Sequence, residues 1–324
     1  MDKIKNIQKN IFLASYTTFK IGGPAKYFYY AKNTKDLIKI IKIAKIKKVP
    51  FFILGCGSNI LVSDEGFNGL VIKIQNFNQR LITSWVTKFK IQEYNSKFKI
   101  ICDSGVLLCK LIRETSKLGA SGLEWFVGIP GTISGAIYGN AGWSKNEKNI
   151  GDLVKNVIVL RNNLQIKISQ KQCKFNYRDS IFKHNNDVIL SAELQLQKKD
   201  PLEIKRKTRE ILAIRKKNCL YGNSAGCIFK NIPCKKIDKK LFKKYSELKN
   251  FDNNFIPAGY LIDQCGLKGK KIGEAMVSKN HANFIINTGQ AQAKDVIILI
   301  SLIKQKVRDK FNIQLQEEIQ YVGF

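Results

Sequence analysis

Three short segments of this sequence carry side chains that can hold or move a proton. Arg178 lies in the run Tyr-Arg-Asp-Ser at 177–180, Cys227 follows a glycine, and Glu318 lies near the last residue. An arginine, a thiol and a carboxylate can together make an acid–base site with a cation that stabilises an oxyanion. Taken singly, each also has a simpler interpretation: a surface pair with Asp179 for the arginine, one more packed thiol for the cysteine, and a solvated edge position for the glutamate.

The placement of glycine is the second chemical signal. Seven of the 23 glycines fall between residues 119 and 142, and two earlier loops read Gly-Gly-Pro at 22–24 and Gly-Cys-Gly-Ser-Asn at 55–59. Glycine lets backbone N–H groups approach a ligand closely, so such loops can cradle a diphosphate. A single Gly-x-Gly is often an ordinary turn, but three loops indicate a dinucleotide site. The loop at 55–59 lacks the third glycine and the downstream acidic residue of a Rossmann fingerprint, so we predict a different dinucleotide fold.

The elements that must position these residues alternate along the chain. Thr34 is the expected N-cap of the first helix, and the run Asp-Pro-Leu-Glu at 200–203 is a typical helix start. The pattern indicates an α/β or α+β protein with mixed sheets and a domain boundary near residue 200. We predict helices at 34–47, 106–118, 201–217 and 295–311, and strands at 51–54, 69–74, 98–102, 154–160, 188–196, 282–287 and 317–323.

The composition limits the partners. Lys and Arg number 56 against 25 Asp and Glu, and the net charge of +31 suggests nucleic acid or another anionic surface. Most of the cations are lysines interleaved with isoleucine and leucine, as on solvated helix faces, and the aromatic residues are scattered. Nucleic-acid binding favours clustered arginine and aromatic residues. We therefore predict no nucleic-acid partner and keep a basic RNA-binding protein as an alternative.

Cysteine usage and apolar runs indicate a cytoplasmic protein. The eight cysteines and two histidines show no Cys-x-x-Cys spacing, so we predict reduced thiols and no metal. The apolar stretch at 11–14 is too short for a signal peptide. The run at 296–303 is far below the roughly 20 residues that cross a bilayer. We predict no membrane insertion and a monomer.

Taken in order, the motifs resemble one family, the UDP-N-acetylenolpyruvoylglucosamine reductases (MurB) of bacterial cell-wall synthesis. The likeness runs from about residue 17 to residue 323. The short link from Arg178 to Asp200 is similar to that of the shorter, second type of this family. The matching blocks are residues 18–25, 54–64, 122–142, 177–182, 224–231, 258–269 and 282–287.

The resemblance implies an α+β fold with FAD as the cofactor. The FAD-binding region is expected to be of the p-cresol methylhydroxylase type, with two α+β subdomains at 1–70 and 71–200. An α/β substrate-binding domain follows at 201–324. The residues expected to bind FAD are Gly22, Gly23, Pro24, Gly55, Gly57, Ser58, Asn59, Gly128, Thr132, Gly135, Asn140 and Gly142.

The resemblance also implies the reaction. NADPH gives a hydride to FAD, and N5 of the reduced flavin passes a hydride to C3 of the enolpyruvyl group of UDP-N-acetylglucosamine enolpyruvate. A proton added at C2 completes UDP-N-acetylmuramate. Arg178 matches the catalytic arginine of the family and Glu318 its C-terminal glutamate. Asn231 matches a substrate-binding asparagine, while Arg215 and Lys217 are candidate contacts to the diphosphate of UDP.

Cys227 is the main departure from the family, which usually has serine as the proton donor at this position. A thiol, with an ordinary pKa near ~8.5, is a far stronger acid than a hydroxyl and can deliver a proton readily. It cannot do so once ionised. The competing hypothesis is another flavin oxidoreductase of the same fold, which would share the glycine loops and would not need Arg178, Cys227 and Glu318.

Overall fold

The computed structural model describes residues 1, 4–74, 88–143, 148–218, 222–237, 243, 245, 248 and 254–324, and the chain forms two compact units. Unit 1 comprises Met1–Ile11, Ala25–Cys56 and Asn68–Lys217, whereas unit 2 comprises Phe12–Pro24, Gly57–Phe67 and Asn218–Phe324. Each unit is described by itself. The predicted division into domains at 1–70, 71–200 and 201–324 stays a prediction, since compactness groups the chain without resolving subdomains.

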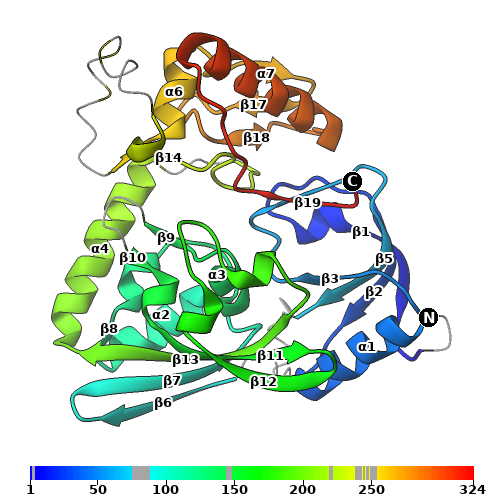
Figure 1. Ribbon diagram of the computed structural model, residues 1–324, viewed down its shortest axis with the longest axis vertical. Helices are drawn as coiled ribbons and strands as arrows, with labels where there is room; N and C mark the ends of the chain where they lie inside the picture. Colours follow the sequence, from blue (N-terminus) through cyan, green and yellow to red (C-terminus); the bar gives the residue numbers. More distant parts are fainter. Residues whose placement is uncertain are drawn as a thin grey trace. The chain divides into compact units, whose positions relative to one another are not determined.

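The first layer of unit 1 is a four-stranded sheet covered by helix α1 (Thr34–Ile46) (Figure 1). The helix buries Leu37, Ile40, Ile41 and Ala44, which is the spacing of one helical face. The sheet has the order β1-β2-β5-β3, and β3 and β5 are parallel. The strands are β1 (Gln8–Phe12), β2 (Pro24–Tyr30), β3 (Phe51–Leu54) and β5 (Phe67–Lys73).

The predicted first helix is confirmed, but the N-cap prediction is wrong by one residue. Asn33 has extended backbone, and its side-chain oxygen accepts a hydrogen bond from the N–H of Asp36 at 2.8 Å. Thr34 is instead the first helical residue. From Asn33 the side chain reaches the third helical N–H, which is the geometry that an N-cap requires.

The second layer of unit 1 is an antiparallel sheet in the order β12-β11-β13-β7-β6, with β8 also paired to β13 (Figure 1). Its core lies between the sheet and helices α2 (Leu108–Lys117) and α3 (Ile133–Tyr138). Helix α4 (Pro201–Asn218) follows, and the Asp200 carboxylate accepts from the N–H of Leu202 at 3.0 Å, as predicted for a helix start. The strands are β6 (Phe89–Tyr94), β7 (Lys97–Asp103), β8 (Ala120–Ser121), β11 (Val154–Arg161), β12 (Leu164–Ser169) and β13 (Val188–Lys198).

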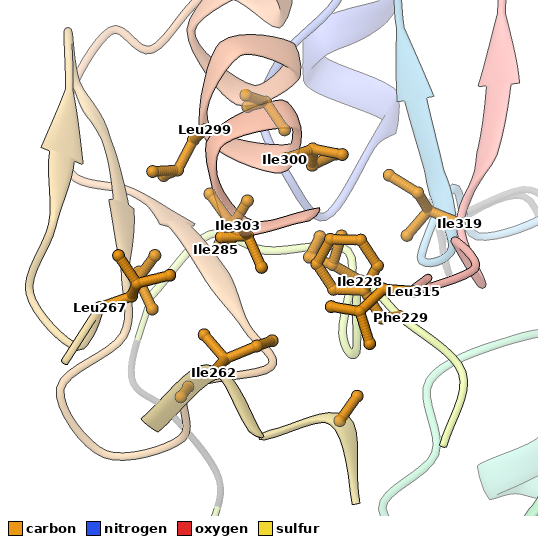
Figure 2. Close-up of a cluster of buried hydrophobic side chains, with 14 of the residues drawn as sticks. Ile228, Phe229, Ile262, Leu267, Ile285, Leu299, Ile300, Ile303, Leu315 and Ile319 are labelled. Atoms are coloured by element: carbon orange, nitrogen blue, oxygen red, sulfur yellow. The ribbon is translucent and has the colours of Figure 1, made fainter. Parts of the chain in front are cut away.

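Unit 2 packs helices α6 (Ala258–Gln264) and α7 (Ala293–Phe311) with a three-stranded antiparallel sheet. Figure 2 shows part of its core, in which Leu299, Ile300 and Ile303 of α7 lie in one buried cluster with Ile228 and Phe229. The segments 12–24 and 57–67 add buried side chains to the same core. The strands of the sheet are β16 (Lys271–Ile272), β17 (Ala275–Val277) and β18 (Ile285–Asn287), and β14 (Ile232–Pro233) pairs with β15 (Phe255–Ile256).

A short parallel pair closes unit 2. Strand β4 (Ile60–Val62) pairs with β19 (Gln320–Val322). Just after β4, the carboxylate of Asp64 accepts from the N–H groups of Ala293 and Lys294, at 2.7 and 3.1 Å, and so caps α7. The predicted strand at 317–323 is shorter than expected, because Glu318 precedes β19. None of the helices in the described ranges combines the length and the apolar character needed to span a membrane.

Candidate functional site

Three residues predicted to bind FAD meet at one hydroxyl group in unit 1. A β-carbon added to Gly55 would lie 2.9 Å from Oγ1 of Thr132, and one added to Gly135 would lie 3.4 Å from the same atom. Thr132 is the N-cap of α3, and its hydroxyl accepts from the N–H of Gly135 at 3.2 Å. The structure therefore packs Gly55 and Gly135 closely against the side chain of Thr132, which leaves too little room for a β-carbon at Gly55.

A lysine that the sequence analysis missed contacts Gly55. Lys73 ends β5, is fully buried, and donates a hydrogen bond to the carbonyl of Gly55. Burial lowers the pKa of Lys73 to about 8, and the nearby Cys56 thiol opposes this shift. Burial raises the pKa of Cys56 to about 11, and Lys73 opposes that shift in turn. Because lysine is common throughout the chain, one more at a strand end gave no signal in the sequence.

The last three residues of the same loop, Gly57–Asn59, belong to unit 2. Among the described residues, the N–H groups of Gly57 and Asn59 donate to no acceptor, and Gly57 has a φ of +64°. Open N–H groups in such a turn are donors that a diphosphate takes, so this part of the loop fits FAD. The side chain of Asn59 serves the protein itself, since its Nδ2 donates to the carbonyl of Glu318 at 3.3 Å.

The first glycine loop is packed against its own unit. A β-carbon added to Gly22 would lie 2.8 Å from Cβ of Val62, and Gly22 has a φ of +141°. The N–H of Gly23 donates to the carbonyl of Ser63 at 2.8 Å. Close backbone packing inside unit 2 is thus enough to require both glycines. Contact of Gly22, Gly23 and Pro24 with FAD stays a prediction, as it does for Ser58.

Asn140 braces the glycine-rich segment of unit 1. Its buried side chain donates to the carbonyl of Asn176 at 2.7 Å and accepts from the N–H of Gly151 at 3.0 Å. Both ends of the amide are therefore used inside the protein. Asn176 begins the turn that carries Arg178, so Asn140 ties that turn to the glycine-rich segment. Its predicted contact with FAD stays a prediction.

The turn at 176–179 directs Arg178 toward the same segment. Arg178 has a φ of +52°, and backbone hydrogen bonds of 3.0 and 3.1 Å join Asn176 and Asp179. The guanidinium donates to the carbonyl of Gly142 at 2.7 Å and lies 5.2 Å from the ring centroid of Tyr177. The Asp179 carboxylate lies 2.9 Å from Nε2 of His184 instead. Arg178 thus contacts the glycine-rich segment through Gly142, and Asp179 contacts His184.

Arg215 lies beside Gly128 in unit 1. A β-carbon added to Gly128, which has a φ of +82°, would lie 3.0 Å from Cδ of Arg215. The structure thus brings a predicted FAD contact and a predicted substrate contact side by side. The side chain of Lys217 lies outside the described residues.

Cys227 and Glu318 lie on adjacent extended segments of unit 2. The N–H of Glu318 donates at 2.7 Å to the carbonyl of Ile228, the residue after Cys227. Cys227 is half-buried, and the space beside the preceding Gly226 is open for 4 Å around an added β-carbon. The structure therefore places a thiol and a carboxylate-bearing segment together next to open space.

Asn231 and Thr18 hold the ends of the segment that carries Cys227. Oδ1 of Asn231 accepts from the N–H of Ala258 at 3.2 Å, at the start of α6. The hydroxyl of Thr18 donates to the carbonyl of Ser224 at 2.7 Å, and its N–H donates to Gly57 at 3.1 Å. The sequence analysis missed this role of Thr18, although the residue opens the first matching block.

Comparison with known proteins defines the class. Residues 25–163 match a family described as FAD binding domain, and residues 217–322 match one described as UDP-N-acetylenolpyruvoylglucosamine reductase, C-terminal domain. The match to an FAD-binding domain and the match to the C-terminal domain of a reductase together make this chain a flavoprotein oxidoreductase with FAD as its cofactor.

Similarity over the whole chain defines the family. The UDP-N-acetylenolpyruvoylglucosamine reductase of Clostridium novyi (strain NT) is 35% identical, with coverage of 100% of this chain and 94% of the relative. That of Caldicellulosiruptor bescii is 38% identical over 96% of this chain and 89% of the relative. The crystal structure of UDP-N-acetylenolpyruvylglucosamine reductase (MurB) from Thermus caldophilus matches at 29% identity and a TM-score of 0.73, covering 98% and 99%. This chain belongs to the UDP-N-acetylenolpyruvoylglucosamine reductase family.

These comparisons confirm several of the predictions made from the sequence. The family, the enzyme class and FAD as cofactor are confirmed. The α+β fold with an FAD-binding domain is confirmed as well.

Lys73 makes stability depend on pH in a testable way. Because the fold lowers the pKa of Lys73 from 10.5 to about 8, the unfolded chain holds a proton between these values that the folded protein has released. The free energy of unfolding therefore rises with pH across this window. The full difference corresponds to about 3 kcal/mol. We expect Lys73→Met to remove this rise of the unfolding free energy with pH.

Urea unfolding of flavin-free protein at several pH values measures this effect. The difference in unfolding free energy between the wild type and Lys73→Met should change steadily from pH 8 to pH 10.5 in favour of the wild type. The matched control is Lys90→Met, at an exposed lysine of β6, which should give a difference that does not vary with pH. A constant difference for Lys73→Met as well would contradict the lowered pKa of this buried lysine.

Proposed function

We propose that this protein reduces UDP-N-acetylglucosamine enolpyruvate to UDP-N-acetylmuramate for peptidoglycan synthesis, with NADPH as the reductant. The observation that carries the proposal is the hydrogen bond from Glu318 to Ile228, which sets the thiol of Cys227 and the Glu318 segment together beside open space. The name shared by the relatives supports the same substrate. We also propose that the enzyme works as a monomer in the cytoplasm, where thiols stay reduced.

The residues that would hold FAD lie in the glycine-rich segments. Gly55 and Gly135 bring their backbone close to the Thr132 side chain in unit 1, and the N–H groups of Gly57 and Asn59 are donors for a diphosphate. The chemistry that FAD supplies when bound is hydride transfer from NADPH to C3 of the enolpyruvyl group. Fixed glycine backbone suits this task because it orients the cofactor without crowding it.

Arg178 would stabilise the charge that develops on the substrate. Hydride addition at C3 moves negative charge onto the carboxylate of the enolpyruvyl group as an enolate. An arginine stays charged at every working pH and offers several donors in a fixed plane. The carbonyl of Gly142 and the ring of Tyr177 hold the guanidinium in place, which preorganises it for an oxyanion.

Cys227 would then give a proton to C2, which completes the reduction: hydride at C3, proton at C2, and NADP⁺ as the second product. The thiol must be protonated before the reaction, and the nearby Glu318 would assist with the same intermediate. Asn231, Arg215 and Lys217 are proposed to bind the sugar nucleotide.

Two anaerobic half-reactions test the proposed function. The purified protein should be yellow, NADPH should bleach the flavin, and UDP-N-acetylglucosamine enolpyruvate should restore the colour without oxygen. Mass spectrometry should find one UDP-N-acetylmuramate for each reduced flavin that recovers its colour. Bleaching by NADPH with no recovery on adding this substrate would instead indicate another oxidoreductase of the same fold.

Arg178 should matter to the second half-reaction and not to the first. The enolate exists only after hydride reaches the substrate, so Arg178→Ala should leave bleaching by NADPH nearly intact. Recovery of the colour should slow by two or more orders of magnitude, as on loss of an oxyanion donor (about 10²–10³). The control is Arg161→Ala, which breaks a 2.7 Å ion pair with Asp187 in the same unit and should affect stability alone. Equal slowing of both half-reactions by Arg178→Ala would point to a structural role.

Cys227 should give the second half-reaction an alkaline limit. A thiol donates a proton only while it is protonated, so recovery of the colour should slow as pH rises and the thiol ionises. Cys227→Ser should keep useful activity and lose this alkaline fall, because a hydroxyl stays protonated. Cys227→Ala should still be bleached by NADPH, but recovery should slow on the order of 10²–10⁴.

Cys265→Ser provides the matched control for this series, since Cys265 is also a half-buried thiol of unit 2. It should change neither half-reaction. If Cys227→Ala recovered its colour at the wild-type rate, water rather than Cys227 would be the proton source.

A further inference from the structure

One buried amide clamps the segment that carries Cys227. Asn283 is 2% exposed. Its Nδ2 donates to the carbonyl of Phe229 at 2.8 Å, and its Oδ1 accepts from the N–H of Phe229 at 2.9 Å. The backbone carbonyl of Asn283 also accepts from the N–H of Ile228 at 2.8 Å. Asn283 thus takes part in three hydrogen bonds, one as donor and two as acceptor, that fix the two residues after Cys227.

The clamped segment is also the one that holds Glu318. Ile228 donates its N–H to Asn283 and offers its carbonyl to Glu318 at 2.7 Å, and Phe229 forms a β-bridge with Glu317. Cys227 itself forms a β-bridge with Phe284, the neighbour of Asn283. The segments with the thiol, the carboxylate and the amide therefore lie in one ladder, with the Cys227 segment in the middle.

Only an amide satisfies this position. The buried N–H and carbonyl of Phe229 need an acceptor and a donor, and asparagine presents both on one short side chain. An apolar side chain would leave both groups without partners in the core, at a cost of several times an ordinary hydrogen bond. The backbone of Phe229 then loses both of the side-chain hydrogen bonds that fix its position.

His281 supports the clamp from the other side. Its Nδ1 accepts from the N–H of Asn283 at 3.2 Å, and Oγ of Ser278 accepts from the N–H of His281 at 3.3 Å. Burial lowers the pKa of His281, a backbone hydrogen bond opposes this, and the charge of Lys268 lowers the pKa further. The neutral ring keeps Nδ1 available as an acceptor, so the loop before Asn283 stays in place.

We propose that Asn283 is a positioning residue for protonation at C2: it holds the thiol of Cys227 in register with Glu318 and does not itself contact the substrate. The proposal rests on the proposed function of Cys227. It predicts that loss of the amide slows the proton-dependent half-reaction and leaves reduction of the flavin unchanged.

The FAD-loaded protein tests this with two variants. Asn283→Ala removes both side-chain hydrogen bonds and Asn283→Asp keeps only the acceptor, which also provides a second variant if the first folds poorly. We expect bleaching by NADPH at the wild-type rate for both. Recovery of the colour by the enolpyruvyl substrate should slow at least tenfold for Asn283→Ala, in kcat rather than in KM.

Asn287→Ala is the matched control. Asn287 is 6% exposed, and its amide donates at 3.1 Å to the carbonyl of Phe19 rather than to the Cys227 segment. It should lower the melting temperature by a similar amount while slowing recovery less than twofold. Equal slowing by Asn287→Ala and Asn283→Ala would overturn the proposal, because general loss of stability would then explain both.

A double-mutant cycle separates this proposal from the role of Cys227. In a Cys227→Ala background, Asn283→Ala should slow recovery by less than a further twofold, because the group that it positions is gone. A full tenfold effect in that background would overturn the positioning role. Cys227→Ala at the wild-type rate would overturn the proposed proton donor instead.

Labelling gives a readout that needs no turnover. Iodoacetamide labelling followed by peptide mapping reports each thiol separately, and the exposed Cys109 serves as the internal reference. Asn283→Ala should change the labelling rate of Cys227 at least fivefold relative to Cys109, and Asn287→Ala should not. Unchanged labelling of Cys227 in Asn283→Ala would overturn the clamp whatever the catalytic result.

Discussion

The parallel pairing of β4 with β19 is the interaction on which the arrangement of unit 2 depends. Gln320, Tyr321 and Val322 pair with Ile60, Leu61 and Val62, so the end of the chain is joined to a strand that begins just after the loop at 55–59. The side chain of Asn59 extends the same contact to the carbonyl of Glu318. This pair adds to the hydrogen bond from Glu318 to Ile228 and the β-bridge between Phe229 and Glu317, which hold the glutamate segment beside the segment that carries Cys227.

Local sequence patterns were enough to predict the four longest helices of the described structure and several of its strands in their order. The face of α1 made by Leu37, Ile40 and Ile41 follows from apolar spacing, and β3 follows from an apolar run after a helix end. The glycine loops could also be recognised in the sequence, because close approach of the backbone requires glycine and so raises the local glycine content. These features depend on residues that lie close together in the sequence, so a single sequence is enough to predict them.

Long-range contacts account for what the sequence did not reveal. The amide of Asn59 meets the carbonyl of Glu318, 259 positions away, and Asn140 meets Asn176. Both asparagines looked like ligand donors, yet the structure uses their side chains to join distant segments. Lys73 was overlooked for a different reason: it is the one buried lysine among the described residues, and its neighbours in the sequence do not distinguish it from the exposed and half-buried lysines.

Strand β4 also affects how the protein is made. On the ribosome it is synthesised long before β19, its only partner strand among the described residues, because Gln320 pairs with Ile60. During that interval β4 offers an unpaired edge, which is the kind of surface that associates with other chains. Contacts between such distant segments also slow folding, because a long loop must close before the pair can form. The same pair that organises the mature unit therefore leaves β4 without this partner strand in the nascent chain until β19 has been synthesised.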